Sequence, residues 1–292
     1  MVNYSITDLE KITGIKAHTI RIWEKRYKVV EPQRTQTNIR CYSDNDLKKL
    51  LNISMLNRYG YRISNIVKMT PQELNERVME ISENSSDHNL QIEHLIVAMM
   101  ELNEEKFEKV LSNSLLKIGF EKTVTDIIYP FLEKVGVLWL VGTINPAEEH
   151  FIINLIRQKL ISAIDSLIVT PSDKAKKIVL FLPANEMHEL SLLFYWYSLK
   201  KRGHKVIYFG QSLPVEHLKS VVTMQSPDYM LTVITTSQTA EQFQNLINLI
   251  ASTLAGINVF ITGLQTREHN VLLPENITVI ENAESFFKQL DG

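Results

Sequence analysis

Glu186 and His188 stand one residue apart, directly after the apolar run at 177–183. A carboxylate that holds one ring nitrogen of a histidine fixes the tautomer and strengthens the other nitrogen as a metal ligand. Ligands also bind where the strands of an open parallel sheet end. The residue types and spacing of the pair are therefore compatible with a metal site. In the alternative interpretation, His188 is an ordinary capping or surface residue.

A second candidate group combines a tryptophan with a carboxylate and an imidazole. Nine residues separate Trp139 from the adjacent pair Glu149 and His150. Neutral imidazole is a good ligand for transition metals near physiological pH, so His150 is a further candidate ligand. In the alternative interpretation, Trp139 fills a helical core and Glu149 complements the dipole at a helix start.

Basic side chains concentrate at the beginning of the chain. Residues 1–70 hold thirteen Lys and Arg against six Asp and Glu, a net charge of +7, whereas the other residues carry a net −9. A small basic head on an acidic body suits phosphate binding by one end of the molecule. Chance clustering of solvated charges would give the same count.

Helix signals in this head predict a winged helix-turn-helix unit. Ser5 or Thr7 is expected to cap a first helix that Gly14 ends, and Ile20 and Trp23 form the inner face of a second. The expected elements are helices at 4–12 and about 17–27, a wing at 33–42, a helix that ends at Arg58, and a fourth that ends near Lys68.

In the rest of the chain, the spacing of apolar residues changes once, after residue 171. Apolar residues recur at helical spacing over 71–171, which predicts a bundle of four or five helices, and Asn145-Pro146 marks the start of a helix that continues to Val169. Short apolar runs without alternation follow, as in buried parallel strands. The expected strands are 177–183, 204–210, 229–236, 258–263 and 277–280, and the expected helices are 186–202, 214–224, 239–253 and 282–290.

These patterns predict a multidomain α and α/β protein with a flavodoxin-like five-stranded parallel sheet. The expected domains are a head at 1–75, a helical bundle at 76–172 and a sheet domain at 173–292. The single Cys41 excludes a disulfide framework or a cysteine-spaced zinc site. The polar N-terminus and the absence of a long apolar run predict a cytoplasmic protein.

The head resembles the MerR family of regulators over residues 4–69, through YSITDLEKITGIKAHTIRIWEKRY, EPQRT, NIRCYS and DLKKLLNISMLNRYGYRISNI. The resemblance implies that the second helix enters the major groove of operator DNA and that the wing contacts the backbone. The implied DNA-binding residues are Lys16, His18, Thr19 and Arg21 in the helix and Arg34, Thr35, Arg40 and Tyr42 in the wing. Alternatively, Arg21 and Arg40 pair with Glu24 or Asp44 on a solvated surface.

Trp23, where many MerR proteins have tyrosine, and the Trp139 motif resemble the light-responsive, cobalamin-dependent repressors of the CarH and LitR type. That resemblance implies adenosylcobalamin as the cofactor, with Trp139 and Glu149 near its upper face and His150 as an upper axial ligand after photolysis. His188 would be the lower axial ligand to cobalt, with Glu186 behind it.

Two positions depart from the cobalamin pattern. Cobalamin-binding domains carry an acidic residue, one spacer, a histidine, two spacers and a glycine after the first strand, and Glu186 and His188 match the first two of these residues. Ser191 stands where that motif has glycine, and Thr262-Gly263 stands where a glycine pair is usual after the fourth strand. Those glycines leave room for the nucleotide tail of the cofactor, and added atoms narrow a packed channel. Ser237 follows the third strand, where a hydroxyl often meets the tail.

Three functions follow from these observations. The first is a DNA-binding regulator that senses adenosylcobalamin, and through it light, as a homodimer or higher oligomer with RNA polymerase as a candidate partner. The second is a regulator whose body is a cofactor-free interaction module. The third is a corrinoid carrier of a methyltransferase, against which the head argues. No phosphate loop, nucleophile triad or catalytic carboxylate pair predicts an enzyme.

Overall fold

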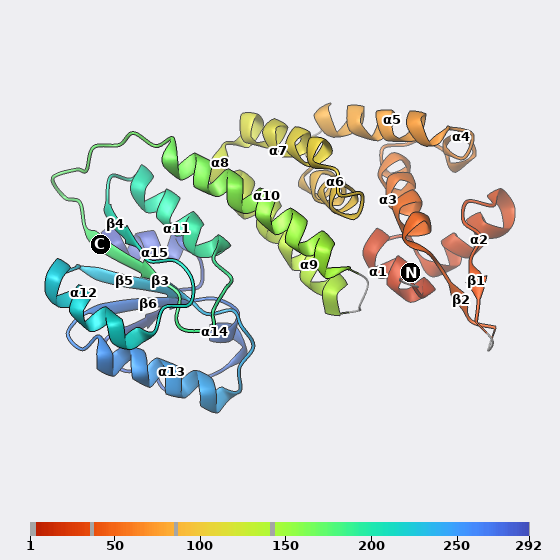
Figure 1. The fold of residues 1–292 in the computed structure, drawn as a ribbon. Coiled ribbons are helices and arrows are strands. Elements are labelled where there is room, and N and C mark those ends of the chain that lie inside the picture. Colours follow the sequence, from red (N-terminus) through yellow and green to blue (C-terminus); the bar gives the residue numbers. More distant parts are fainter. Residues whose placement is uncertain (1–3, 36–37, 85–86, 141–143, 292) are drawn as a thin grey trace. The chain divides into compact units, whose positions relative to one another are not determined.

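The structure is a computed structural model that describes every residue except 1–3, 36–37, 85–86, 141–143 and 292 (Figure 1). The chain forms two compact units, residues 1–155 and 156–292. The first unit holds both the predicted head and most of the predicted bundle. Helix α10 (Pro146–Asp165) begins in the first unit and ends in the second. The three predicted domains stay a prediction.

The head has the predicted order of helices and wing. Ser5 and Ser43 each begin a helix with a capping box, in which the serine hydroxyl accepts from the third backbone amide and Asp8 or Asp46 accepts from the serine amide. Gly14 then ends α1 in the left-handed region, at φ 70°. The elements are α1 (Ile6–Thr13), α2 (Ala17–Tyr27), β1 (Gln33–Arg34), β2 (Arg40–Cys41), α3 (Asp44–Arg58) and α4 (Ile63–Ile66).

The helical bundle surrounds one nearly buried helix. In α6 (His88–Met100) every residue from 90 to 100 is buried, and all but Gln91, Glu93 and His94 in that stretch are apolar. One turn of wider π-helix, η1 (Val124–Ile128), ends just before Pro130, which has no amide hydrogen to donate. The other elements are α5 (Pro71–Asn84), α7 (Glu104–Ile118), α8 (Phe120–Thr123), α9 (Tyr129–Leu140) and α10.

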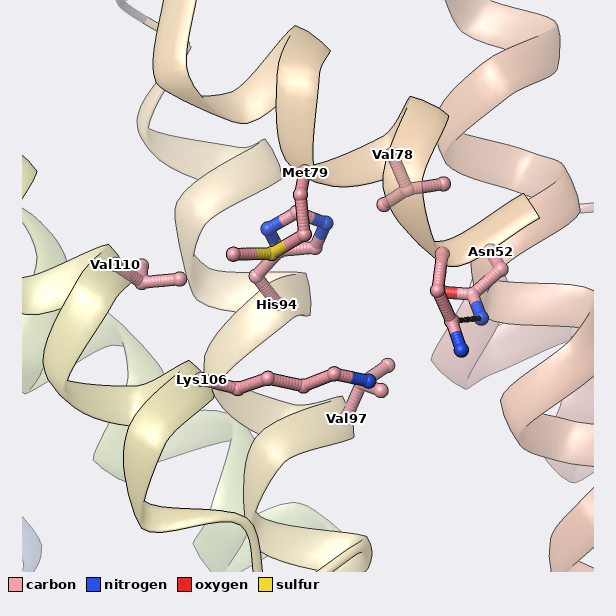
Figure 2. Close-up of a pocket in the computed structure, with 8 residues that line it drawn as sticks. Asn52, Val78, Met79, His94, Val97, Lys106 and Val110 are labelled. Atoms are coloured by element: carbon pink, nitrogen blue, oxygen red, sulfur yellow. Dashed lines mark hydrogen bonds between the residues drawn. The ribbon is translucent and has the colours of Figure 1, made fainter. Parts of the chain in front are cut away.

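His94 lies in a small pocket where the head and the bundle meet (Figure 2). Its side chain is buried, and its Nδ1 has no hydrogen-bond partner among the residues that the structure describes. The pocket is lined from four helices, by Asn52 of α3, Asn75, Val78 and Met79 of α5, Val97 of α6, and Lys106 and Val110 of α7. Burial, and then the charge of Lys106, lowers the pKa of His94 to about 4. His94 is therefore a neutral core residue.

The second unit is a parallel sheet in the order β4-β3-β5-β6-β7, which is the predicted flavodoxin-like order. Helices cover both of its faces: α11 and α15 pack over one apolar core, and α12 and α13 over the other. The strands are β3 (Lys177–Phe181), β4 (Lys205–Tyr208), β5 (Tyr229–Val233), β6 (Asn258–Thr262) and β7 (Ile277–Val279). The helical elements are α11 (Leu190–Lys201), η2 (Val215–His217), α12 (Leu218–Gln225), α13 (Ala240–Thr253), α14 (Gln265–Glu268) and α15 (Ala283–Asp291).

Several predicted boundaries were wrong. Helix α10 ends at Asp165 rather than Val169, and the residues after it are mostly exposed, so no packing extends the helix. The helix expected from 186 begins at Leu190, because the Glu186 side chain bonds outside the helix. The fourth helix of the head is a single turn. None of the helices in the described parts of the chain is long and apolar enough to cross a membrane.

His94→Leu should reduce the loss of stability in acid. The pKa of His94 falls from 6.5 to about 4 on folding, so the unfolded chain binds the proton preferentially between these values. Stability present above pH 6.5 is therefore lost as the pH falls towards 4, by about 2 kcal/mol between pH 7 and pH 5. Urea unfolding at pH 7 and pH 5 should show a smaller difference in the free energy of unfolding in the variant than in the wild type. An equal difference in both proteins would contradict a buried neutral His94.

Candidate functional site

The outer surface of α2 carries the predicted recognition side chains. His18 and Arg21 are exposed, together with Ile22 and Lys25 on the neighbouring positions of the same surface. Lys16, just before the helix, is also exposed and pairs with Glu10 at 3.1 Å. Residues spaced three and four apart share one side of a helix, so these side chains can enter one groove together.

Thr19 lies on a different side of the same helix. It is half-buried and lines a polar cleft in the first unit, with Arg58 of α3, Glu93 of α6 and Lys134 of α9. Arg58 and the buried Glu93 form an ion pair that joins the head to the bundle. Thr19 is therefore placed for contact with the body of the protein as well as near the DNA-facing surface.

The described residues next to the tip of the wing are exposed. Arg34 donates to the side chain of Asn38 at 2.7 Å, and Thr35 accepts from the amide of Ile39 at 3.1 Å. Asn38 has a φ of 63°, a left-handed conformation that asparagine tolerates. Arg34 and Thr35 are exposed where phosphate could reach them. The two residues between Thr35 and Asn38 lie outside the described part of the chain.

Glu24 joins the wing to the recognition helix. Its carboxylate accepts from Arg40 Nε at 3.2 Å and from the Tyr42 hydroxyl at 3.3 Å. Tyr42 is completely buried, and burial, followed by the charge of Glu24, raises the pKa of its hydroxyl to about 12. The structure thus places Tyr42 in the core rather than on the surface, and the suggested pairing with Glu24 is present for Arg40. Both side chains orient the wing.

The Trp139 group lies near the end of α9 and the start of α10. The Trp139 side chain is 51% exposed, so the interpretation in which it fills the core is wrong. His150 is exposed and Glu149 half-buried in the first turn of α10. Glu148, rather than Glu149, accepts from the amide of Asn145, at 3.1 Å, although both carboxylates suit the helix dipole.

Glu186 holds the ring of His188. Glu186 Oε1 lies 2.6 Å from His188 Nδ1, and the carboxylate is 2% exposed while the imidazole is 60% exposed. The other oxygen accepts from the backbone amides of Thr235 and Thr236, both at 2.7 Å. Burial alone would raise the pKa of Glu186, but the hydrogen bonds from His188 and from these amides outweigh it and lower the pKa to about 2.

Thr235 and Thr236 are site residues that the sequence analysis missed. They follow β5, beside β3 in the sheet, and the Thr236 hydroxyl donates to Glu186 at 3.0 Å. Their position directly after a buried strand was the available signal. Ser237, which the sequence analysis selected instead, is exposed one residue further on.

Exposed apolar side chains lie next to His188 in the chain and at the same edge of the sheet. Met187 precedes it, and Phe209 and Leu264 follow β4 and β6; they are 55%, 39% and 47% exposed. Parallel strands end at one edge, so these side chains extend an apolar surface around the imidazole. Such a surface suits a flat, largely apolar ring.

The two departures from the cobalamin pattern lie beside α11. Ser191 is half-buried in its first turn. Thr262 is buried at the end of β6 and forms a side-chain hydrogen bond with Tyr195 of α11. Gly263 retains the glycine of the pattern in a position that needs it, with φ 118° and the Ile234 carbonyl oxygen 2.3 Å from where a Cβ would lie. The exposed imidazole of His188, held by Glu186, would therefore suit a cobalt cofactor, whereas Thr262 occupies space that glycine would leave open.

A recognition helix and a joined wing, both with exposed cations, define a winged helix-turn-helix DNA-binding protein. Residues 4–73 match the family described as MerR HTH family regulatory protein, and residues 91–162 match the B12 binding domain. The chain is a MerR-type transcription regulator that carries a B12-binding domain, as the sequence predicted.

Two relatives that align with most of this chain are named as transcriptional repressors. The chain is similar to the HTH-type transcriptional repressor CarH of Myxococcus xanthus, at 26% identity over 99% of this chain and 98% of CarH. It is also similar to the repressor CarA of the same organism, at 23% identity over 90% of this chain and 88% of CarA. The monomethylamine corrinoid protein of Methanosarcina barkeri aligns with 74% of this chain and 99% of its own, at 11% identity and a TM-score of 0.46, too low to establish a shared fold.

Gly263→Ala should destabilise the second unit by about 3 kcal/mol, because its Cβ would overlap the Ile234 backbone. Gly256→Ala is the matched control, since Gly256 also has a positive φ, of 86°, but has open space around it. That control should cost about 1 kcal/mol from the backbone alone. Thermal unfolding of both variants measures the difference, and equal costs would contradict the close approach at Gly263.

Proposed function

We propose that this chain is a transcription regulator whose operator binding is controlled by adenosylcobalamin held on His188. The hydrogen bond between Glu186 and His188 Nδ1, at 2.6 Å, is the observation that carries the proposal. The cofactor supplies a cobalt–carbon bond that light can break. The relatives CarH and CarA, as named repressors, support the regulatory role without a catalytic one.

Glu186 decides which nitrogen of His188 faces the ligand. The low pKa of Glu186 keeps its carboxylate ionised, so the nearby Nδ1 carries the proton and donates. The lone pair of the neutral ring then lies on Nε2, which is the nitrogen proposed as the lower axial ligand. A single imidazole suffices for a metal whose other positions a macrocycle fills.

On the upper side, we assign Trp139, Glu149 and His150 to the proposed site. Their partial or full exposure supports this assignment, since each side chain is open to a ligand. His150 is the candidate for the upper axial position after light exposure, because a neutral imidazole is a suitable donor. Residues 91–162, which match the B12 binding domain, include all three of these residues.

In the proposed DNA complex, His18 and Arg21 reach base edges or phosphates, and Lys16, Arg34 and Thr35 bind the backbone. We propose a homodimer or higher oligomer, because two linked heads bind an operator far better than one. RNA polymerase is the candidate partner at the promoter, and the cytoplasm is the proposed setting. Thr19, Arg40 and Tyr42 act in this proposal mainly by holding the head together.

One observation favours a second candidate function, in which the body is a cofactor-free interaction module. The buried hydroxyl of Thr262 bonds to Tyr195, and Tyr195 packs edge-on against Phe286, with ring centroids 5.4 Å apart. A core filled in this way can resist insertion of a nucleotide tail. The DNA-binding head would work in the same manner, but the body would respond to a protein or another ligand.

Cobalamin binding is tested by incubating the protein with adenosylcobalamin in darkness and recording the absorbance spectrum after gel filtration. We expect a retained corrin spectrum that changes under green light and is lost in His188→Ala, because the axial imidazole is removed. Ser191→Gly/Thr262→Gly is the matched variant for the tail channel. A corrin retained only by that double variant would establish the cofactor-free function for the natural chain.

Arg21→Ala should weaken binding to DNA fragments selected from a random pool by about tenfold to a hundredfold, by loss of a base or phosphate contact. Arg26→Ala is the control: Arg26 stands about 140° around α2 from Arg21 and lies 5.3 Å from the Tyr27 ring. Binding should be measured at several salt concentrations. Equal losses in both variants would contradict the proposed DNA-facing surface.

A further inference from the structure

His188 lies between two buried carboxylates that are anchored to different elements. Glu186 is anchored to the end of β5 through the amides of Thr235 and Thr236. Glu189 is also buried, but it bonds elsewhere: the Tyr208 hydroxyl at the end of β4 donates to it at 2.7 Å. The short loop that carries His188 is therefore held from both sides.

The second anchor of Glu189 comes from outside the sheet. Arg157 of α10 donates through Nε to Glu189 Oε1 at 2.5 Å, and the Glu189 side chain is 6% exposed. The hydrogen bond from Arg157 is charge-assisted, and such bonds are about twice as strong as neutral ones. Loss of Arg157 would leave a buried carboxylate with one neutral donor, so the loop would lose much of its support.

Arg157 also belongs to α10, the helix that carries Glu149 and His150 near its start. Arg157 follows His150 by seven positions of unbroken helix, a rise of about 10.5 Å. The end of α10 is tied to α11 as well, because Lys200 donates to the Ile164 carbonyl at 2.7 Å. Of these two contacts of α10, only the ion pair between Arg157 and Glu189 involves the residue next to His188.

We propose that Arg157 is a positioning residue that couples α10 to the His188 loop through Glu189. The inference rests on the proposed function for its biological meaning, since His150 at the start of α10 and His188 beyond Glu189 are the two candidate axial ligands. A change in the position of α10 then alters the orientation of the His188 loop, and a change at His188 acts back on α10. Such coupling is reciprocal.

The coupling can be tested without cofactor, by amide hydrogen exchange of the full chain. Arg157→Met should speed exchange about tenfold in peptides covering both 150–165 and 184–193, because it releases the two segments from each other. Tyr208→Phe should speed exchange only in 184–193, since it leaves the ion pair in place. Gln158→Met, an exposed neighbour on α10, is the control and should change neither segment.

The same variants are then titrated with adenosylcobalamin in darkness. Arg157→Met should lower the affinity about tenfold and reduce the fraction with the His188-ligated spectrum, and Arg157→Lys should restore part of both, because it keeps the charge. Exchange in 184–193 that is unchanged in Arg157→Met would overturn the coupling, whether or not cobalamin binds. If Arg157→Met speeds exchange in both segments while the wild-type protein retains no cobalamin, the positioning role is supported and the proposed cofactor is refuted.

Discussion

Burial of the Glu186 carboxylate is the constraint on which the candidate cofactor site depends. An ionised group in the interior must be surrounded by donors, and here two backbone amides after β5, the His188 amide and the His188 ring supply them. Because those amides belong to a neighbouring strand end, the loop after β3 stays non-helical through His188, and α11 begins only at Leu190. The same bonds orient the imidazole towards solvent.

The head and the bundle use buried carboxylates in a comparable way. Glu24 accepts from Arg40 and Tyr42 and so keeps the wing against the recognition helix. Glu93 of α6 pairs with Arg58 of α3, which joins the head to the bundle inside the first unit. Such pairs contribute more to geometry than to net stability, because desolvation offsets most of their attraction. They suit a regulator, in which relative placement has to be defined and still be changeable.

The nucleotide-tail region shows how the two candidate functions differ physically. An axial imidazole needs only an exposed, oriented ring, which the Glu186–His188 pair supplies. A displaced tail needs open volume inside the sheet domain, and the side chains of Thr262 and Tyr195 meet in the region concerned. The two requirements are independent, so a chain can retain the first and lose the second. The packing beside α11, rather than the Glu186–His188 pair, therefore distinguishes a cobalamin sensor from a cofactor-free module.

The sequence by itself determined most of the elements and the parallel, flavodoxin-like class of the sheet, because these depend on local signals. Apolar periodicity, the Ser5 and Ser43 caps, Gly14 and the unalternated strands all act within a few residues. It also indicated Glu186 and His188, whose spacing is local. Only the tertiary structure decided that Tyr42 is core, that Trp139 is exposed, that Thr235 and Thr236 hold Glu186, and that Arg157 reaches Glu189. Each of these depends on contacts between residues far apart in the chain, which no local pattern encodes.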